Sequence, residues 1–156
     1  MDPLSIFVLQ LVLSITVFTI VAKWYVSPWL AEKTNGQALT VLIFPHAMRH
    51  IGLLFFVPGV VSQPLPDFFS YTAAYGDLVS GLLALLALVI LRKGWGIAIP
   101  LVWLFNIVVS VDLLNALRHV DVVPDLGATW YIPTFLVPLL LVTHAMIFAR
   151  LLRRAH

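Results

Sequence analysis

Residues 4–22 read LSIFVLQLVLSITVFTIVA, and this stretch contains no charged side chain. A run of this length is about what an α-helix needs to cross the ~30 Å apolar core of a bilayer. It is longer than the usual core of a secretory signal, no basic segment precedes it, and no small-residue cleavage site follows it. We therefore interpret it as a retained membrane-spanning helix over about residues 4–23.

The rest of the chain repeats this pattern. Of its 156 residues, 62% are hydrophobic and only 10% are charged, whereas about 25% charged residues are usual in a soluble domain. So few charges cannot cover a water-soluble surface. The sequence predicts one transmembrane helical domain over residues 1–156, an all-α integral membrane bundle of about five helices. The four further spans are expected at about 38–62, 72–91, 95–117 and 134–152.

The second apolar run is the least regular. It contains Pro45 and the pair Pro58-Gly59, and each proline removes a backbone donor and favours a kink. Backbone groups freed in this way are tolerated in a membrane only where protein or a water-filled cavity covers them. An arrangement of four spans plus a re-entrant or broken segment, from about residue 52 to 62, is therefore an alternative.

The positions of lysine and arginine predict the orientation, because cytoplasmic loops carry an excess of basic residues. With five spans, an N-terminus outside and a C-terminus in the cytoplasm, seven of the nine basic residues fall on the inner side. We expect a multi-pass protein of a bacterial inner or plasma membrane, with the lipid bilayer as its main partner. The net charge of +2 gives no indication of nucleic acid. The seven inner residues are Lys23, Lys33, Arg92, Lys93, Arg150, Arg153 and Arg154.

Polar groups inside the second run are the first functional candidates, because ionisable side chains in a bilayer are costly. His46, Arg49 and His50 are related by steps of three and four residues, which would place them on one face of an α-helix. Arg49 keeps its proton and so needs an acid, an anionic ligand or water. The acids available within the spans are Asp77 and Asp112.

The later spans add the remaining candidates. Asp112 and Asn115 share one face of the fourth span and, with Asp77, would form an outer entrance to the pocket. Small residues such as Ser80 and Gly81 along the third span predict close approach of a neighbouring helix. The complete set of expected ligand-binding residues is His46, Arg49, His50, Asp77, Asn106, Asp112, Asn115 and His144.

The leading functional hypothesis is the binding or passage of a small polar or anionic ligand, or of protons, in this pocket. A second hypothesis rests on the depth of two histidines in the membrane. His46 and His144 each lie ~12 Å from the inner ends of their helices at 1.5 Å per residue. Haem b or a metal could then be held by His46 or His50 together with His144. A third hypothesis is a non-catalytic subunit of a larger membrane complex, and a homo-oligomer is also open.

Several classes of chemistry are excluded or unsupported. The chain has no cysteine, which removes thiol nucleophiles, cysteine-ligated zinc and iron–sulfur clusters. The sequence contains no P-loop, G-x-S-x-G, H-E-x-x-H or EF-hand pattern. The intramembrane polar residues could also serve only as hydrogen-bonded packing between helices, so the sequence leaves open whether the protein is an enzyme.

Overall fold

The computed structural model describes residues 1–62 and 64–153, so Arg154 and His156 of the basic tail lie outside the described residues. The chain is 86% helical, and the described part contains no strand. Five helices are long and apolar enough to cross a membrane, which confirms the expected all-helical class. These helices are Pro3–Ala31, Asn35–Phe56, Asp67–Lys93, Ala98–Ala116 and Gly127–Arg153.

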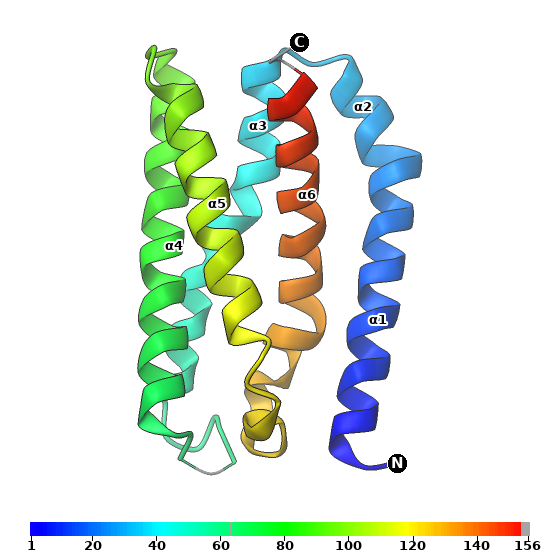
Figure 1. Cartoon of the computed structure of the whole chain (residues 1–156), viewed down its shortest axis with the longest axis vertical. Coiled ribbons are helices and arrows are strands. Elements are labelled where there is room, and N and C mark those ends of the chain that lie inside the picture. Colours follow the sequence, from blue (N-terminus) through cyan, green and yellow to red (C-terminus); the bar gives the residue numbers. More distant parts are fainter. Residues whose placement is uncertain (63, 154–156) are drawn as a thin grey trace.

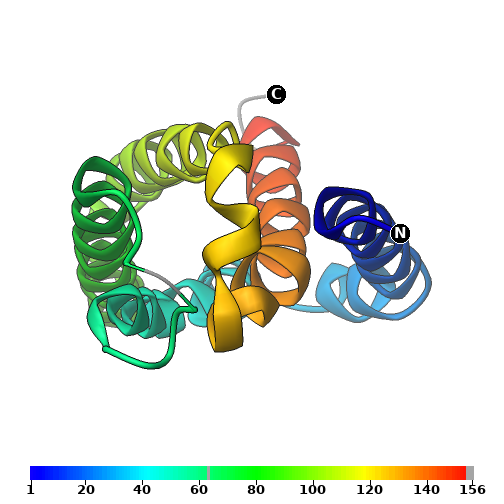
Figure 2. The ribbon, with the colours of Figure 1, turned by 90° about the horizontal axis from the view of Figure 1, so that it is seen from below.

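The helices run side by side between two ends of the molecule, with the N-terminus at one end and the C-terminus at the other (Figure 1). Viewed along the bundle, the second to the fifth span form a ring, and the first span lies outside it against the last (Figure 2). The elements are α1 (Pro3–Val21), η1 (Ala22–Val26), α2 (Ser27–Ala31), α3 (Asn35–Ile43), η2 (Phe44–Phe56), α4 (Asp67–Lys93), α5 (Ala98–Ala116), η3 (Val120–Asp125), η4 (Gly127–Trp130), η5 (Ile132–Leu136) and α6 (Val137–Arg153).

Helix α1 is attached to the ring by a few specific contacts near the N-terminal end. The indole Nε1 of Trp130 donates to Oε1 of Gln10 at 2.6 Å, and the same indole meets Phe7 edge to face. Further along, Phe18 packs edge to face on Phe135. Gln10, the one amide in the first apolar run, therefore serves to dock this helix.

At the opposite end, Arg150 of α6 joins the first two spans to the last. Its guanidinium donates to the backbone oxygens of Leu30 and Lys33 at 2.9 and 3.1 Å and to Oδ1 of Asn35 at 3.3 Å. The two carbonyls belong to the last turn before the chain reverses, where backbone oxygens lack the partner that a continuing α-helix would supply, and the Leu30 oxygen also accepts from the backbone N–H of Lys33. Thr34 then starts α3 with a capping box.

The second span consists of two kinds of helix joined end to end. Its first part, α3, is an α-helix, and its second part, η2, is a 3₁₀ helix that continues to the far end of the bundle (Figure 1). The re-entrant alternative is therefore not what is observed. The helix ends at Phe56, earlier than the expected residue 62, because Val57 is extended and Gly59 turns the chain with a φ of 81°.

The 3₁₀ geometry changes which side chains of the second span face the interior. Residues three apart are eclipsed in a 3₁₀ helix, which has 3.0 residues per turn. The buried residues of η2 accordingly follow a strict three-residue step: His46, Arg49, Gly52 and Phe55. His50 falls outside this row and is exposed. The expectation that His50 shares a face with His46 and Arg49 was wrong, because it assumed an α-helix.

The close approach predicted for the third span occurs between α4 and η2. Gly81 is buried, and a Cβ atom at this position would lie 3.4 Å from the backbone oxygen of Ala47. Ser80 and Ala84 are buried on the same side of α4. The small side chains let the two backbones come together, which brings the polar row of η2 next to Asp77.

The end of the ring nearer the C-terminus is filled by an apolar core. Its side chains come from α3, α4, α5 and α6 and begin one turn beyond His46 and His144. They leave the polar residues of η2 open only toward the other end of the bundle. Members of this inner core include Leu39, Ile43, Ala84, Val102, Phe105 and Ile147.

Candidate functional site

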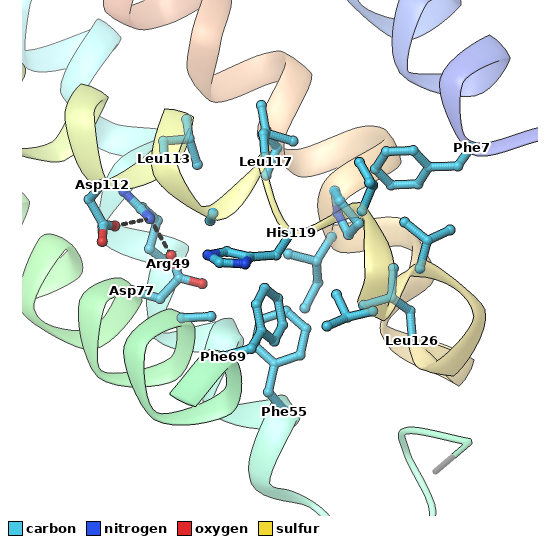
Figure 3. Close-up of a pocket in the computed structure, with 18 residues that line it drawn as sticks. Phe7, Arg49, Phe55, Phe69, Asp77, Asp112, Leu113, Leu117, His119 and Leu126 are labelled. Atoms are coloured by element: carbon cyan, nitrogen blue, oxygen red, sulfur yellow. Dashed lines mark hydrogen bonds and ion pairs between the residues drawn. The ribbon is translucent and has the colours of Figure 1, made fainter. Parts of the chain in front are cut away.

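A pocket opens near the N-terminal end of the ring, between η2, α4, α5 and the segment that follows α5 (Figure 3). Its cavity volume is about 60 Å³, and it widens toward an open mouth. Most of its wall is apolar, and Phe7 of α1 contributes to it from outside the ring. We call it the outer pocket. Its principal lining residues are Phe7, Phe55, Phe69, Ala73, Leu117, His119 and Leu126, with three charged residues at its floor.

The charged floor consists of Arg49 held between two carboxylates. Its Nε donates to Oδ1 of Asp77 at 2.6 Å, and its Nη2 donates to Oδ2 of Asp112 at 2.8 Å (Figure 3). Nη2 also forms an ion pair with Asp77. Arg49 is 2% exposed, whereas the side chain of Asp112 is 27% exposed. The predicted contact of Arg49 with Asp77 or Asp112 is confirmed, and both acids are used at once.

Two glycines make room for these carboxylates. A Cβ atom at Gly52 would overlap the carboxylate of Asp77, and one at Gly76 would lie 2.6 Å from Oδ1 of Asp112. Gly52 follows Arg49 by three residues, so the 3₁₀ helix places it directly beside the guanidinium row. From the sequence, Gly76 was expected only as one of the small residues that let helices approach, and Gly52 was missed, although its three-residue spacing from Arg49 was a usable signal once the helix type was known.

One turn further into the bundle, His46 of η2 meets His144 of α6. Their ring centroids are 4.1 Å apart, and Phe105 of α5 packs edge to face on His46. His46 is 0% and His144 3% exposed. Nε2 of His46 bonds to Oγ1 of Thr143 at 3.0 Å, and Nδ1 of His144 bonds to Oδ1 of Asn106 at 2.6 Å. The two histidines predicted to share a depth are therefore in direct contact.

The other expected site residues are distributed differently. Asn106 belongs to the histidine pair, where it bridges side chain and backbone of His144. Asn115 is exposed and lines only a small recess beside the outer pocket. Nδ1 of His50 lies 3.1 Å from the backbone oxygen of Ala47, outside the site. His119, which is not among the expected site residues, lines the outer pocket and packs edge to face on Phe69.

The histidine pair does not have the shape of a haem site. Two axial imidazoles would need to approach the iron from opposite faces of the macrocycle, with each nitrogen ~2 Å from the metal. The rings of His46 and His144 lie against each other, and no porphyrin fits between them. His50 lies on the exposed side of η2 and cannot replace His46. Within residues 1–62 and 64–153, no cluster of three metal-ligating side chains is found either.

The fold is an all-helical bundle with five helices long and apolar enough to cross a membrane, and its site is a buried arginine–carboxylate triad beneath an apolar pocket. A family model described as "Domain of unknown function (DUF8737)" matches residues 6–152. The chain therefore belongs to that family. Neither the search of curated proteins nor the search of solved structures found a match.

Proposed function

We propose that this protein binds a small, mainly apolar molecule with a protonated or hydrogen-bond-donating head group. The molecule would occupy the outer pocket, with its head at the floor and its body against the aromatic wall. The observation that carries the proposal is the composition of the floor, where two carboxylates face one guanidinium inside an apolar cavity. Sites for small molecules commonly combine an apolar wall with a few convergent polar groups.

The balance of charge favours a donor over an anion. Arg49 directs Nε and Nη2 at Asp77 and Asp112, so among its nitrogens only Nη1 has no partner in the described part of the chain, and an anion bound there would lie beside two carboxylates. With both carboxylates ionised, the floor carries one negative charge in excess. Asp112 is the more exposed acid, and a cationic or donating head group could pair with it without disturbing Arg49.

Binding is favoured over passage by what lies beyond the floor. The polar row of η2 leads from Arg49 to the histidine pair and then meets the inner core around Ile43, Phe105 and Ile147. Moving a polar molecule through such a close-packed apolar region would leave its polar groups without partners. A pocket open toward one end and closed toward the other suits a receptor or sensor better than a channel.

The proposal includes an orientation with the N-terminus outside, so that the outer pocket faces away from the cytoplasm. The connections between α2 and α3 and between α4 and α5 lie at the C-terminal end (Figure 1); Lys33 belongs to the first connection, and Lys93 is the last residue of α4. Reporter fusions after these residues and after Arg154 should read cytoplasmic. Fusions near Asp67 and Asp125 should read external, and a cytoplasmic reading at Asp125 would contradict the orientation.

The ligand class is tested with three probes of one shape and different charge: 2-phenylethylamine, 2-phenylethanol and 3-phenylpropionate. Binding to the purified full chain in lipid nanodiscs is measured by calorimetry, with empty nanodiscs correcting for partition into lipid. We expect the amine to bind most tightly and the carboxylate most weakly. Asp112→Asn should reduce the preference for the amine over the alcohol by about tenfold, the equivalent of one charge-assisted hydrogen bond of ~1.4 kcal/mol.

Two variants control this experiment. Ala73→Phe places a ring in the outer pocket and should reduce binding of all three probes. His50→Gln alters an exposed residue on the same 3₁₀ helix and should leave all three affinities unchanged. Equal binding of the amine and the carboxylate, or probe binding that survives Ala73→Phe, would refute the proposed ligand class.

A further inference from the structure

The histidine pair has a property that the outer pocket does not explain. His46 and His144 are both buried, they belong to different helices, and they touch. A neutral imidazole has one nitrogen that donates and one that accepts. Which nitrogen carries the hydrogen follows from the bonds that each ring makes.

In His144, Nδ1 must be the donor. Asn106 donates from Nδ2 to the backbone oxygen of His144 at 3.3 Å, which fixes the orientation of the amide. Oδ1 of Asn106 can then only accept, and it lies 2.6 Å from Nδ1 of His144. Nε2 of the neutral ring is therefore a bare acceptor.

In His46, Nε2 is the donor. The hydroxyl of Thr143 lies 3.1 Å and 3.0 Å from the backbone oxygens of Leu139 and Leu140, and it donates its one hydrogen there. Its oxygen then accepts from Nε2 of His46 at 3.0 Å. Nδ1 of His46 is left as the second bare acceptor.

Both bare nitrogens are enclosed. Nδ1 of His46 and Nε2 of His144 are buried and have no hydrogen-bond partner among the residues that the structure describes. Two buried acceptors without a donor are costly, at roughly 1–3 kcal/mol each. Two leucines would pack the same space without that cost, and one added proton would give both nitrogens a hydrogen bond.

We infer that His46 and His144 form a binding site for a single proton, shared between Nδ1 of His46 and Nε2 of His144 through one water molecule. The proton converts one ring to imidazolium, which donates to the water, and the water donates to the other ring. The inference does not depend on a ligand in the outer pocket, and it assigns the pair a function separate from that pocket.

The charged groups near the pair act in opposite directions on this added charge. The nearest is Arg49, three residues along η2 and thus ~6 Å along a 3₁₀ helix. Its positive charge is countered by Asp77 on α4 and Asp112 on α5, which together leave one negative charge in excess when ionised. On α5 and α6, the groups bonded to the pair are the neutral Asn106 and Thr143.

The proton would come from the outer pocket. From the pair toward the C-terminal end, the apolar inner core begins at once with Ile43 and Ile147. Toward the other end, Arg49 and its carboxylates reach the wall of the pocket. The site would therefore respond to the pH on the pocket side of the membrane and not to that on the opposite side.

The test uses the full chain in nanodiscs with ¹⁵N-labelled histidine and NMR detection of the ring nitrogens. Single His→Gln variants assign the five histidines. At high pH, we expect hydrogen on Nε2 of His46 and on Nδ1 of His144. As the pH falls, the signals of both rings should move together in one step that binds one proton, because coupled groups titrate as a pair.

His46→Gln is the informative variant, since its amide can still donate to Thr143 but offers no ring acceptor. It should abolish the shared step, whereas His50→Gln, on the exposed side of η2, should leave it unchanged. If His46→Gln fails to fold, the wild-type spectra alone still decide. The inference is overturned if either ring carries hydrogen on the other nitrogen. It is also overturned if the rings titrate independently, or if both stay neutral across the pH range in which the protein remains folded.

The side from which the proton enters is tested in vesicles with the chain in one orientation. A pH jump on the pocket side should shift the histidine signals, and the same jump on the opposite side should not. An equal response from both sides would contradict the claim that the inner core blocks protons. A response only from the side opposite the pocket would contradict the claim that protons enter through the outer pocket.

Discussion

The two halves of the second span differ in a way that explains the site. In α3, the buried residues Ala38, Leu39, Leu42 and Ile43 follow the broad stripe of an α-helix. In η2, the buried residues are every third one. The first half buries only apolar side chains in the inner core, whereas the second half directs a histidine toward α6 and an arginine and a glycine toward α4.

This difference shows that the type of helix determines which polar residues lie on the same face and contact the neighbouring helices. A 3₁₀ helix places residues i and i+3 in line, whereas an α-helix rotates them apart by about 60°. The narrow row lets Arg49 lie between Asp77 and Asp112 with Gly52 beside it. Long 3₁₀ helices are uncommon and often mark functional positions, which agrees with a site built on this half.

The largest expected effect comes from removing the guanidinium from the 3₁₀ half. Arg49→Ala leaves two carboxylates inside the membrane without their cation, and we expect a loss of roughly 3–5 kcal/mol in the free energy of unfolding. The loss is measured by reversible denaturation in mixed micelles. A second change, Asp77→Asn, should restore part of it because the two residues are directly paired. Strictly additive losses would contradict the pairing.

A smaller effect on the free energy of unfolding is expected when a glycine in each half of the second span is replaced by alanine. Gly52→Ala adds a Cβ atom that overlaps the carboxylate of Asp77, and overpacking of this kind costs about 1–3 kcal/mol. Gly36→Ala in α3 is the matched control, since nothing lies within 4 Å of the added atom. It should be neutral or stabilise the helix by up to ~1 kcal/mol. Equal effects at the two glycines would remove the distinction between the halves.

The smallest effect is expected at the histidine that the 3₁₀ row excludes. His50→Leu replaces an exposed side chain and should change the free energy of unfolding by less than about 0.5 kcal/mol. His46→Leu removes the bond to Thr143 and should cost roughly 1–3 kcal/mol. The same denaturation assay compares the two variants. A cost at His50 equal to that at His46 would indicate that both face the interior.

Much of the site follows from sequence because charge leaves few solutions in a membrane. A buried arginine needs acids, and Asp77 and Asp112 were the two within the spans. The shared depth of His46 and His144 followed from counting residues along two helices. The position of His50 could not be obtained in this way, because His46 and Arg49 lie near one another in either helix type. Local sequence does not distinguish the two periods.

A pocket with Asp77 and Asp112 at its outer entrance was expected, but the apolar wall of the outer pocket was beyond the reach of sequence. Its wall combines Phe7 of α1 with Phe55 and Phe69, and these come together only through the packing of helices distant in the chain. The length of the second span was overestimated because residues 57–62 are apolar, although Gly59 turns the chain there. The apolar composition of a segment indicates that its surroundings are apolar. It does not determine whether the backbone of that segment is helical.

The 3₁₀ register of η2 is tested most directly at Phe55 and Phe56. From Arg49, an α-helix at ~100° per residue would turn Phe56 to within ~20° of the interior direction and Phe55 away from it. A 3₁₀ helix at ~120° per residue reverses the two, and here Phe55 is 7% and Phe56 37% exposed. The chain has no cysteine, so Phe55→Cys and Phe56→Cys can each carry one nitroxide label. Measured by spin-label relaxation in bilayers, oxygen accessibility should be low at residue 55 and high at residue 56. The opposite order would contradict the 3₁₀ register and the site built on it.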